Sequence, residues 1–164
     1  MSVGGDEIRA LADRLAVGEL CDRYLLVLDE GRFDESWAAG VFTDDVELAF
    51  PPGTHHGLAG LDAFTATFMG PWARTHHHTG NYLIDLDGDQ AAFTCPVIAT
   101  HVHPGSPPPP APANLFRLGG WFSGTAVRTP SGWRLNRLAL RVTWTVGSGA
   151  PAIVATMTAA QRAG

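Results

Sequence analysis

Three consecutive histidines, His76, His77 and His78, stand in the segment RTHHHTG and could take part in chemistry. Imidazole groups act as general acids and bases near neutral pH, and they also bind metal ions. Side chains alternate between the two faces of a strand, so His77 is expected on one face and its two neighbours on the other. Only one of these two sets can point into a protein interior.

Two carboxylates fall on an apolar stripe of the first expected helix, residues 6–29. Asp22 and Asp29 recur there at helical spacing with leucines. A charged side chain at a position where the pattern calls for an apolar one marks function or strain. Desolvation and the negative end of the helix dipole both predict a raised pKa for Asp29, in a range useful for a general acid or base. The alternatives are that Asp29 faces water at the helix end and that Asp22 pairs with an arginine.

Helices are expected before position 70 and long strands after it. Capping residues predict helices at 6–29, at 34–37 with Asp34 as its cap, and from about 61, and Gly31 is expected to end the first helix. Strands are expected within 43–53, 74–86, 90–103, 115–128 and 133–146, and the Asp-Gly pair at 87–88 predicts the hairpin turn between the second and third of them. This order predicts a single α+β domain over residues 1–164, in which a curved, mostly antiparallel sheet wraps around an N-terminal helix group as a cone. The proline-rich stretch 103–114 is expected to be a loop, and the tail 148–164 to pack loosely or stay mobile.

Composition excludes several classes of protein. The formal net charge is −5 and the eleven basic residues are scattered, whereas a nucleic-acid-binding protein carries a basic stripe. No apolar run approaches the roughly 18 residues of a membrane span, and the N-terminus has no signal-peptide pattern. Cys21 and Cys95 sit in apolar segments and are expected to be buried, reduced thiols, which predicts a cytoplasmic protein.

The segments RYLLVLDEGRFDESW, FTDD, RTHHHTGNYLIDLDGDQA and the closing W-R-L…W strand resemble, in that order, the SnoaL-like branch of the NTF2-like superfamily. The resemblance covers about residues 6–147 and implies the cone-shaped α+β fold. The motifs are most similar to those of scytalone dehydratase-like proteins, whose Tyr-x4-Asp-x4-Asp pattern matches Tyr24, Asp29 and Asp34.

That resemblance implies site residues. Asp29 takes the position of a pocket aspartate, His77 that of a pocket histidine, and a second histidine corresponds to His101 or His103. The chain departs from the pattern on the penultimate strand, where glycine and phenylalanine replace the family's serine and asparagine. The Asp–His pair therefore carries over, but dehydration itself is not implied.

A cofactor-independent lyase, isomerase or cyclase is the function that this reading predicts. Asp29 and His77 would form an acid–base pair that removes a proton next to a carbonyl group of a hydrophobic, polyketide-like or other natural-product substrate. Neither a cofactor nor a metal is needed for such a step. The residues expected to bind substrate are Tyr24, Trp72, Asn81, Tyr82, Phe93, His101 and Trp121.

Three other expectations follow from the sequence. The same pocket could belong to a non-catalytic binding protein or to an accessory subunit. A metal site is the other rival, because His101 and His103 fall on one face of a strand. The last two strands carry apolar residues such as Trp121 and Trp144 on both faces, but helices cover only one face of the sheet. The uncovered apolar surface predicts a homodimer through the convex face.

Overall fold

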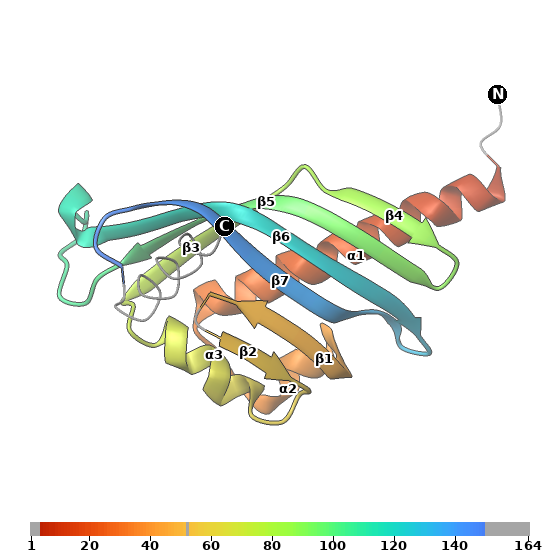
Figure 1. Ribbon diagram of the computed structural model, residues 1–164, viewed down its shortest axis with the longest axis horizontal. Coiled ribbons are helices and arrows are strands. Elements are labelled where there is room, and N and C mark those ends of the chain that lie inside the picture. Colours follow the sequence, from red (N-terminus) through yellow and green to blue (C-terminus); the bar gives the residue numbers. More distant parts are fainter. Residues whose placement is uncertain (1–3, 52, 150–164) are drawn as a thin grey trace, which may run out of the picture.

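The computed structural model describes residues 4–51 and 53–149, which form three helices and a seven-stranded sheet (Figure 1). The helices are α1 (Gly5–Glu30), α2 (Glu35–Ala39) and α3 (Leu61–Met69). The strands are β1 (Phe42–Phe50), β2 (Gly53–His56), β3 (Arg74–Thr79), β4 (Leu83–Asp87), β5 (Gln90–Val102), β6 (Leu115–Thr129) and β7 (Gly132–Val146). A short 3-10 turn, η1 (Pro112–Asn114), leads into β6.

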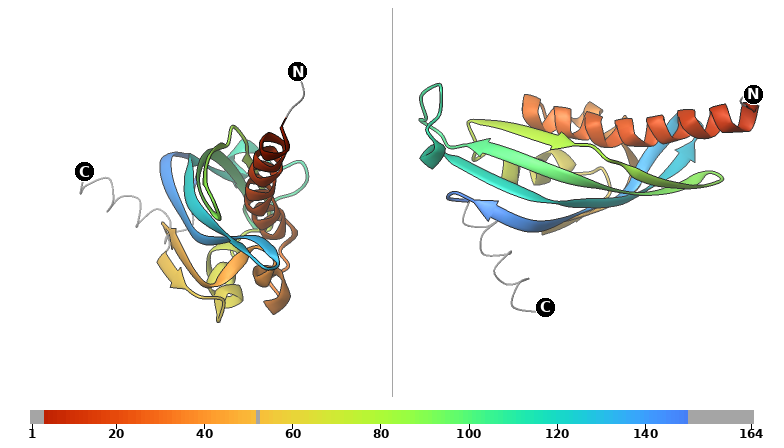
Figure 2. Two further views of the ribbon diagram at one scale, coloured as in Figure 1. Left: turned by 90° about the vertical axis from the view of Figure 1, so that its right-hand side faces the viewer. Right: turned by 90° about the horizontal axis from the view of Figure 1, so that it is seen from above.

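The strand order is β2-β1-β7-β6-β5-β3, and β4 also pairs with β5. Every pair is antiparallel except β1 with β7, which is parallel. The long strands curve, and α1 runs along one side of them (Figures 1 and 2). The expected α+β fold, a curved and mostly antiparallel sheet around an N-terminal helix, is confirmed.

Helix α1 changes character along its length. Its first half exposes Ile8, Leu11 and Leu15, whereas Val17, Leu20, Cys21, Tyr24, Leu25 and Leu28 of its second half are buried. The helix ends at Gly31, which has a φ of 65° and closes the last turn with an N–H···O bond to Val27, as its glycine predicted. Asp29 therefore lies in the last turn, at the end of the part of α1 that is packed against the sheet.

The strand expected over 74–86 is broken. Three residues between β3 and β4 leave the ladder, and Asn81 among them has a φ of 50°. The hydroxyls of Thr79 and Tyr82 donate to Oδ1 of Asp22, and the Tyr82 ring packs over Gly18 of α1. Asp22 thus holds the break in place, and among the described ion pairs it has no arginine partner.

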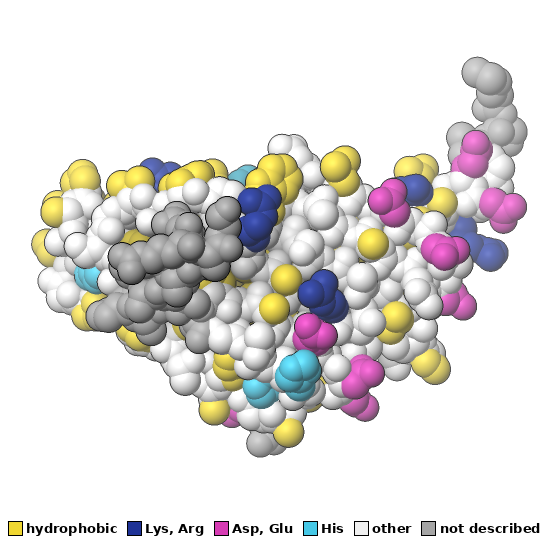
Figure 3. All heavy atoms as spheres, in the orientation of Figure 1, with side chains coloured by type: hydrophobic (Ala, Val, Ile, Leu, Met, Phe, Trp, Pro, Cys, Tyr) yellow, Lys and Arg dark blue, Asp and Glu magenta, His cyan; other side chains and the backbone are white. Residues whose placement is uncertain are grey.

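The sheet has an inner face towards α1 and an outer face away from it. Inward residues of β5 and β6 are buried, whereas Ile98, Trp121 and Trp144 are exposed on the outer face. Figure 3 shows hydrophobic and charged side chains interspersed on the side towards the viewer, with acidic groups gathered near the start of α1. The proline-rich stretch forms the β5–β6 loop, as expected, and most of the tail 148–164 lies outside the described residues. Nowhere in the described ranges is a helix both long enough and apolar enough to cross a membrane.

Candidate active site

Asp29 and His77 are in direct contact where α1 meets β3. Nδ1 of His77 lies 2.7 Å from Oδ1 of Asp29, and the backbone N–H of His77 donates to Oδ2 at 2.9 Å. The hydroxyl of Thr75, two residues earlier on the same face of β3, donates to Oδ1 at 2.8 Å. The His77 side chain is 7% exposed, that of Asp29 20% and that of His76 82%, so the middle histidine of the three is the one turned inward.

The pKa of Asp29 is lowered, not raised as the sequence predicted. Burial is the largest single influence and would raise the pKa, but the hydrogen bonds from the side chain and backbone of His77, its charge and the Thr75 hydroxyl together outweigh it. An ionised carboxylate can only accept, so Nδ1 of His77 carries the hydrogen in this contact. Nε2 is the ring nitrogen left for a ligand.

His101 of β5 is the second histidine beside His77, with ring centroids 5.5 Å apart and planes at 88°. Nδ1 of His101 donates to the carbonyl oxygen of Phe116 at 3.4 Å. Burial is the main cause that lowers the pKa of His101 to about 4, and the nearby His77 lowers it further. The imidazole is therefore neutral at neutral pH. The Trp72 ring packs against His101 at 4.8 Å and stacks on Phe116 at 5.6 Å, which fixes the ring from behind.

A cavity lies on the inner face of the sheet, between α1, α3 and strands β5 to β7. Its lining includes Tyr24, His77 and His101 together with hydrocarbon side chains such as those of Phe50, Leu118 and Phe122. Burial raises the pKa of the Tyr24 phenol, so this group stays protonated. The cavity thus combines an apolar wall with the imidazole rings of His77 and His101, and it can hold an apolar molecule against a basic nitrogen.

Of the seven residues expected to bind substrate, Tyr24 and His101 line the cavity. Trp72 lies behind His101, and Asn81 is exposed in the β3–β4 break. Tyr82 bonds to Asp22 and lines a separate groove between α1 and β4, and Phe93 packs on Gly124 in the core. Trp121 is on the outer face, because residues two apart share a face and Phe122 takes the inward position.

Sequence reasoning missed several lining residues. Phe68 and Met69 come from the end of α3, and Pro51 from the turn after β1. The bond of Thr75 to Asp29 does have a sequence signal, because Thr75 lies two positions before His77 and so shares its face of the strand. The α3 residues carry no local signal that distinguishes a cavity wall from ordinary core.

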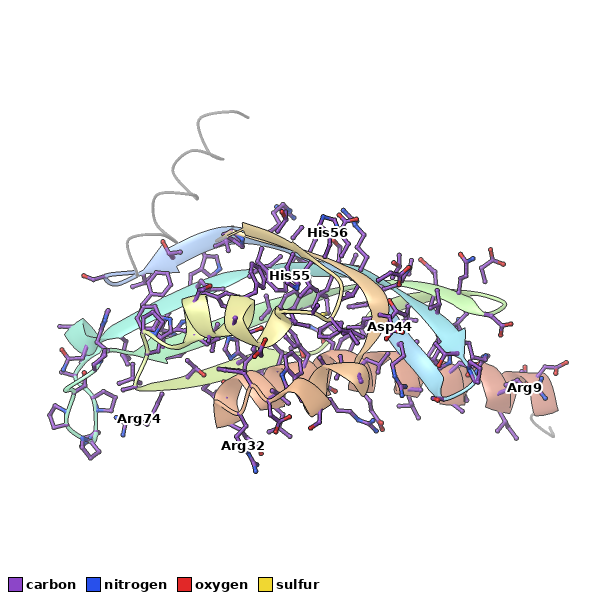
Figure 4. All side chains as sticks on the ribbon, turned by 90° about the horizontal axis from the view of Figure 1, so that it is seen from below. Arg9, Arg32, Asp44, His55, His56 and Arg74 are labelled. Carbon is purple, nitrogen blue, oxygen red and sulfur yellow. The ribbon has the colours of Figure 1, made fainter. Side chains whose placement is uncertain are left out.

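The remaining histidines do not join this site. His55 and His56 are on β2, at the opposite edge of the sheet from β3, and Figure 4 shows them far from Arg74, the first residue of β3. His103 donates from Nε2 to the carbonyl oxygen of Ser148 at 2.7 Å, so His101 alone of this pair faces the cavity. Within the described ranges, no three His, Cys, Asp or Glu side chains are grouped so that they could hold a metal ion.

Known proteins are similar to this chain in sequence or in fold. An uncharacterized protein of Mycobacterium tuberculosis is 26% identical over 137 residues, which cover 79% of this chain and 85% of that protein. A protein of Novosphingobium aromaticivorans assigned provisionally as a scytalone dehydratase is 24% identical, with a TM-score of 0.72 over 86% of this chain and 91% of its own. A hexachlorocyclohexane dehydrochlorinase of Novosphingobium barchaimii is 18% identical, with a TM-score of 0.71 over 88% of this chain and 99% of its own.

The family model of the SnoaL-like domain matches residues 9–139. This range runs from the first half of α1 to β7 and includes Asp29, His77 and His101. The resemblance inferred from the sequence motifs is thereby confirmed, and the curved, unclosed sheet agrees with the NTF2-like fold. The chain belongs to the SnoaL-like domain family.

Proposed function

We propose that this protein is a cofactor-independent lyase, isomerase or cyclase in which Asp29 and His77 handle the proton. The observation that carries the proposal is the 2.7 Å contact between Nδ1 of His77 and Oδ1 of Asp29 at the wall of an apolar cavity. The names of two proteins with this fold, a dehydratase and a dehydrochlorinase, denote eliminations and support the same class of reaction.

In the proposed reaction the two groups have different roles. Nε2 of His77 takes a proton from a carbon next to a carbonyl group, and the electron pair left behind moves to the carbonyl oxygen or expels a leaving group. Asp29 stays ionised, keeps the ring in one tautomer and stabilises the imidazolium that forms. A positioned base of this kind contributes on the order of 10²–10⁴-fold to the rate. The substrate is hydrophobic, since the apolar cavity wall favours the burial of apolar surface.

Hydrogen exchange tests the proposal without knowledge of the substrate. Cyclohexanone in D2O exchanges the hydrogens next to its carbonyl group, and NMR follows the loss of their signal. We expect the exchange rate with the wild type to exceed the rate in buffer alone. In His77→Gln this enzyme-dependent part of the rate should fall about 100-fold. His78→Gln, an exposed neighbour on the other face, is the matched control and should keep it. Wild-type exchange in His77→Gln would overturn the proposal.

A ligand carrier or accessory subunit is the second candidate, because apart from Tyr24, His77 and His101 the described lining is apolar. Such a protein would bind ketones in the same cavity and leave their hydrogens in place. Binding by the wild type with exchange no faster than buffer would decide for this candidate.

We also propose that the protein is a homodimer through the outer face. Ile98, Trp121 and Trp144 are each more than two-fifths exposed there, and apolar surface of this kind usually has a partner. A second copy would cover it around a twofold axis. Sedimentation at micromolar concentration should show a dimer, and a monomer would contradict this.

A cytoplasmic location is part of the proposal. Cys21 and Cys95 are buried and unpaired, which suits a reducing compartment. Fractionation of the source cells should recover the protein with the cytosolic markers, and recovery with envelope or secreted material would contradict it.

A further inference from the structure

The described lining of the cavity contains no permanent cation that would balance an anion. Among the described residues that line it none is Arg, Asp or Glu, and the whole chain contains no lysine. Proteins hold carboxylates and phosphates with Arg or Lys side chains or with helix N-termini. This cavity lies instead beside Leu28, in the last turn of α1, where the dipole is negative.

The polar groups present add no net positive charge. The Asp29 carboxylate contacts His77 directly, so even a protonated His77 only balances it. His101 is neutral, because an imidazole whose pKa is about 4 is uncharged at neutral pH. Tyr24 is a neutral phenol. An anionic ligand would lose its hydration without gaining a cation, which disfavours binding of a buried charge.

The cavity is also small. Its volume is about 60 Å³, less than half that of a cavity of about 150 Å³ that holds benzene. Close-packed aromatic side chains of Phe50, Phe68 and Phe122 form much of its wall. This space therefore takes no group larger than one six-membered ring.

We propose that the part of the substrate held in this cavity is a compact, uncharged, apolar group no larger than one ring, and that carboxylates and phosphates are excluded. The inference rests on the proposed function in taking this cavity as the substrate site. It narrows the substrate class from hydrophobic molecules in general to small neutral ones such as cyclic ketones, alcohols or halides.

Probes matched in shape test the charge. Cyclohexylmethanol and cyclohexanecarboxylate have the same ring and nearly the same size, and differ in charge at pH 7. Titration of the full chain, followed by NMR shifts of the cavity residues, should show binding of the alcohol and at least tenfold weaker binding of the carboxylate. Leu83→Ala, an exposed position on β4, should leave both affinities unchanged. Equal or tighter binding of the carboxylate would overturn the inference.

A second pair tests the size. Cyclohexanone should bind the wild type more tightly than the two-ring ketone 1-tetralone, although tetralone has more apolar surface. Leu118→Ala, which opens the wall, should improve tetralone binding at least tenfold; Leu140→Ala, at a half-buried wall position, serves if that variant does not fold. Tighter binding of tetralone than of cyclohexanone to the wild type would contradict the proposed size.

The two proposals fail separately. Binding of the neutral ligands without hydrogen exchange would remove the enzymatic function and leave the ligand class standing. Exchange that depends on His77, together with undiminished carboxylate binding, would keep the enzymatic function and remove the proposed ligand class.

Discussion

His77 occupies both oxygens of the Asp29 carboxylate, one through Nδ1 at 2.7 Å and the other through its backbone N–H at 2.9 Å. Strand β3 is at the edge of the sheet, so the N–H groups that point away from β5 need a partner from elsewhere. Asp29 supplies one from the last turn of α1. The same carboxylate therefore closes the packing of α1 on β3 and orients the ring that faces the cavity.

Asp29→Asn should destabilise the protein and do so in a pH-dependent way. Hydrogen bonds to an ionised group contribute about 1.5–3 kcal/mol each, and partial exposure reduces this, so we expect a loss of roughly 1–3 kcal/mol at pH 7. The folded pKa of Asp29 is below the ordinary 3.8. Its stabilisation is thus present above about pH 4 and is lost as the pH falls through the folded pKa.

Urea denaturation of the wild type and Asp29→Asn between pH 7 and pH 2.5 measures this difference. The two curves should converge at the acid end. A gap that stays constant over the whole range would show that the carboxylate is not held ionised by His77 and Thr75.

His101 should make the fold sensitive to mild acid. Its pKa is about 4 in the folded protein against an ordinary 6.5, so the unfolded chain takes up a proton that the folded chain refuses. Stability is therefore lost progressively as the pH falls from about 6.5 to about 4. His101→Asn removes the titrating group while keeping an N–H for the carbonyl group of Phe116, and should flatten the pH dependence in that window.

An NMR titration provides the direct check, because the His101 ring signals should move with a midpoint near pH 4. A midpoint near 6.5 would mean that the ring is more hydrated than its burial indicates. Equal pH slopes for the wild type and His101→Asn would contradict the prediction in the same way.

Local sequence signals predicted the local features correctly. Gly31 ends α1, Asp34 caps α2 by accepting the Ser36 N–H at 3.0 Å, and Gly88 turns the β4–β5 hairpin with a φ of 57°. Alternation along a strand separated His77 from its two neighbours, and the family resemblance selected His77 as the inward one, which is where the structure has it. These features depend on residues within a few positions, so one stretch of sequence contains their cause.

Features set by distant partners were not predictable. The lowered pKa of Asp29 depends on Thr75 and His77, which lie 46 and 48 positions away. Trp121 and Phe122 are adjacent and both large, so alternation could not tell which one points inward. Phe93 does face inward, but its place along β5 puts it on Gly124 in the core and away from the cavity.

Arg128 should hold the first half of α1 against the β4–β5 turn. Its guanidinium bonds both oxygens of Asp13 on α1 at 2.9 and 2.7 Å, reaches Asp89 at 2.8 Å and lies 4.5 Å from the Trp133 ring centroid. A lysine keeps the charge but cannot form this fork. Arg128→Lys should therefore lower the melting temperature by several degrees, since about 1 kcal/mol corresponds to roughly 2–4 °C in a chain of this size.

Calorimetry of Arg128→Lys beside Arg137→Lys provides the comparison. Arg137 is half-exposed and makes a single ion pair at 3.6 Å, so its replacement should change the melting temperature little. Equal effects of the two substitutions would show that the fork geometry of Arg128 contributes nothing beyond its charge.

Gly119 and Trp144 should be energetically coupled on the outer face. The two residues are cross-strand neighbours, and a Cβ on Gly119 would lie 2.1 Å from Cε2 of the Trp144 ring, so the ring occupies the space that the glycine leaves. Gly119→Ala must displace the indole, and we expect a loss of about 1–3 kcal/mol. Trp144→Ala removes the obstacle, so the double variant should be more stable than the sum of the two single effects predicts. A double-mutant cycle by urea denaturation measures this coupling, with Gly80→Ala as a control because no atom lies within 4 Å of its Cβ position. Additive effects within about 0.5 kcal/mol would mean that the ring moves aside freely and that Trp144 does not require a glycine beneath it.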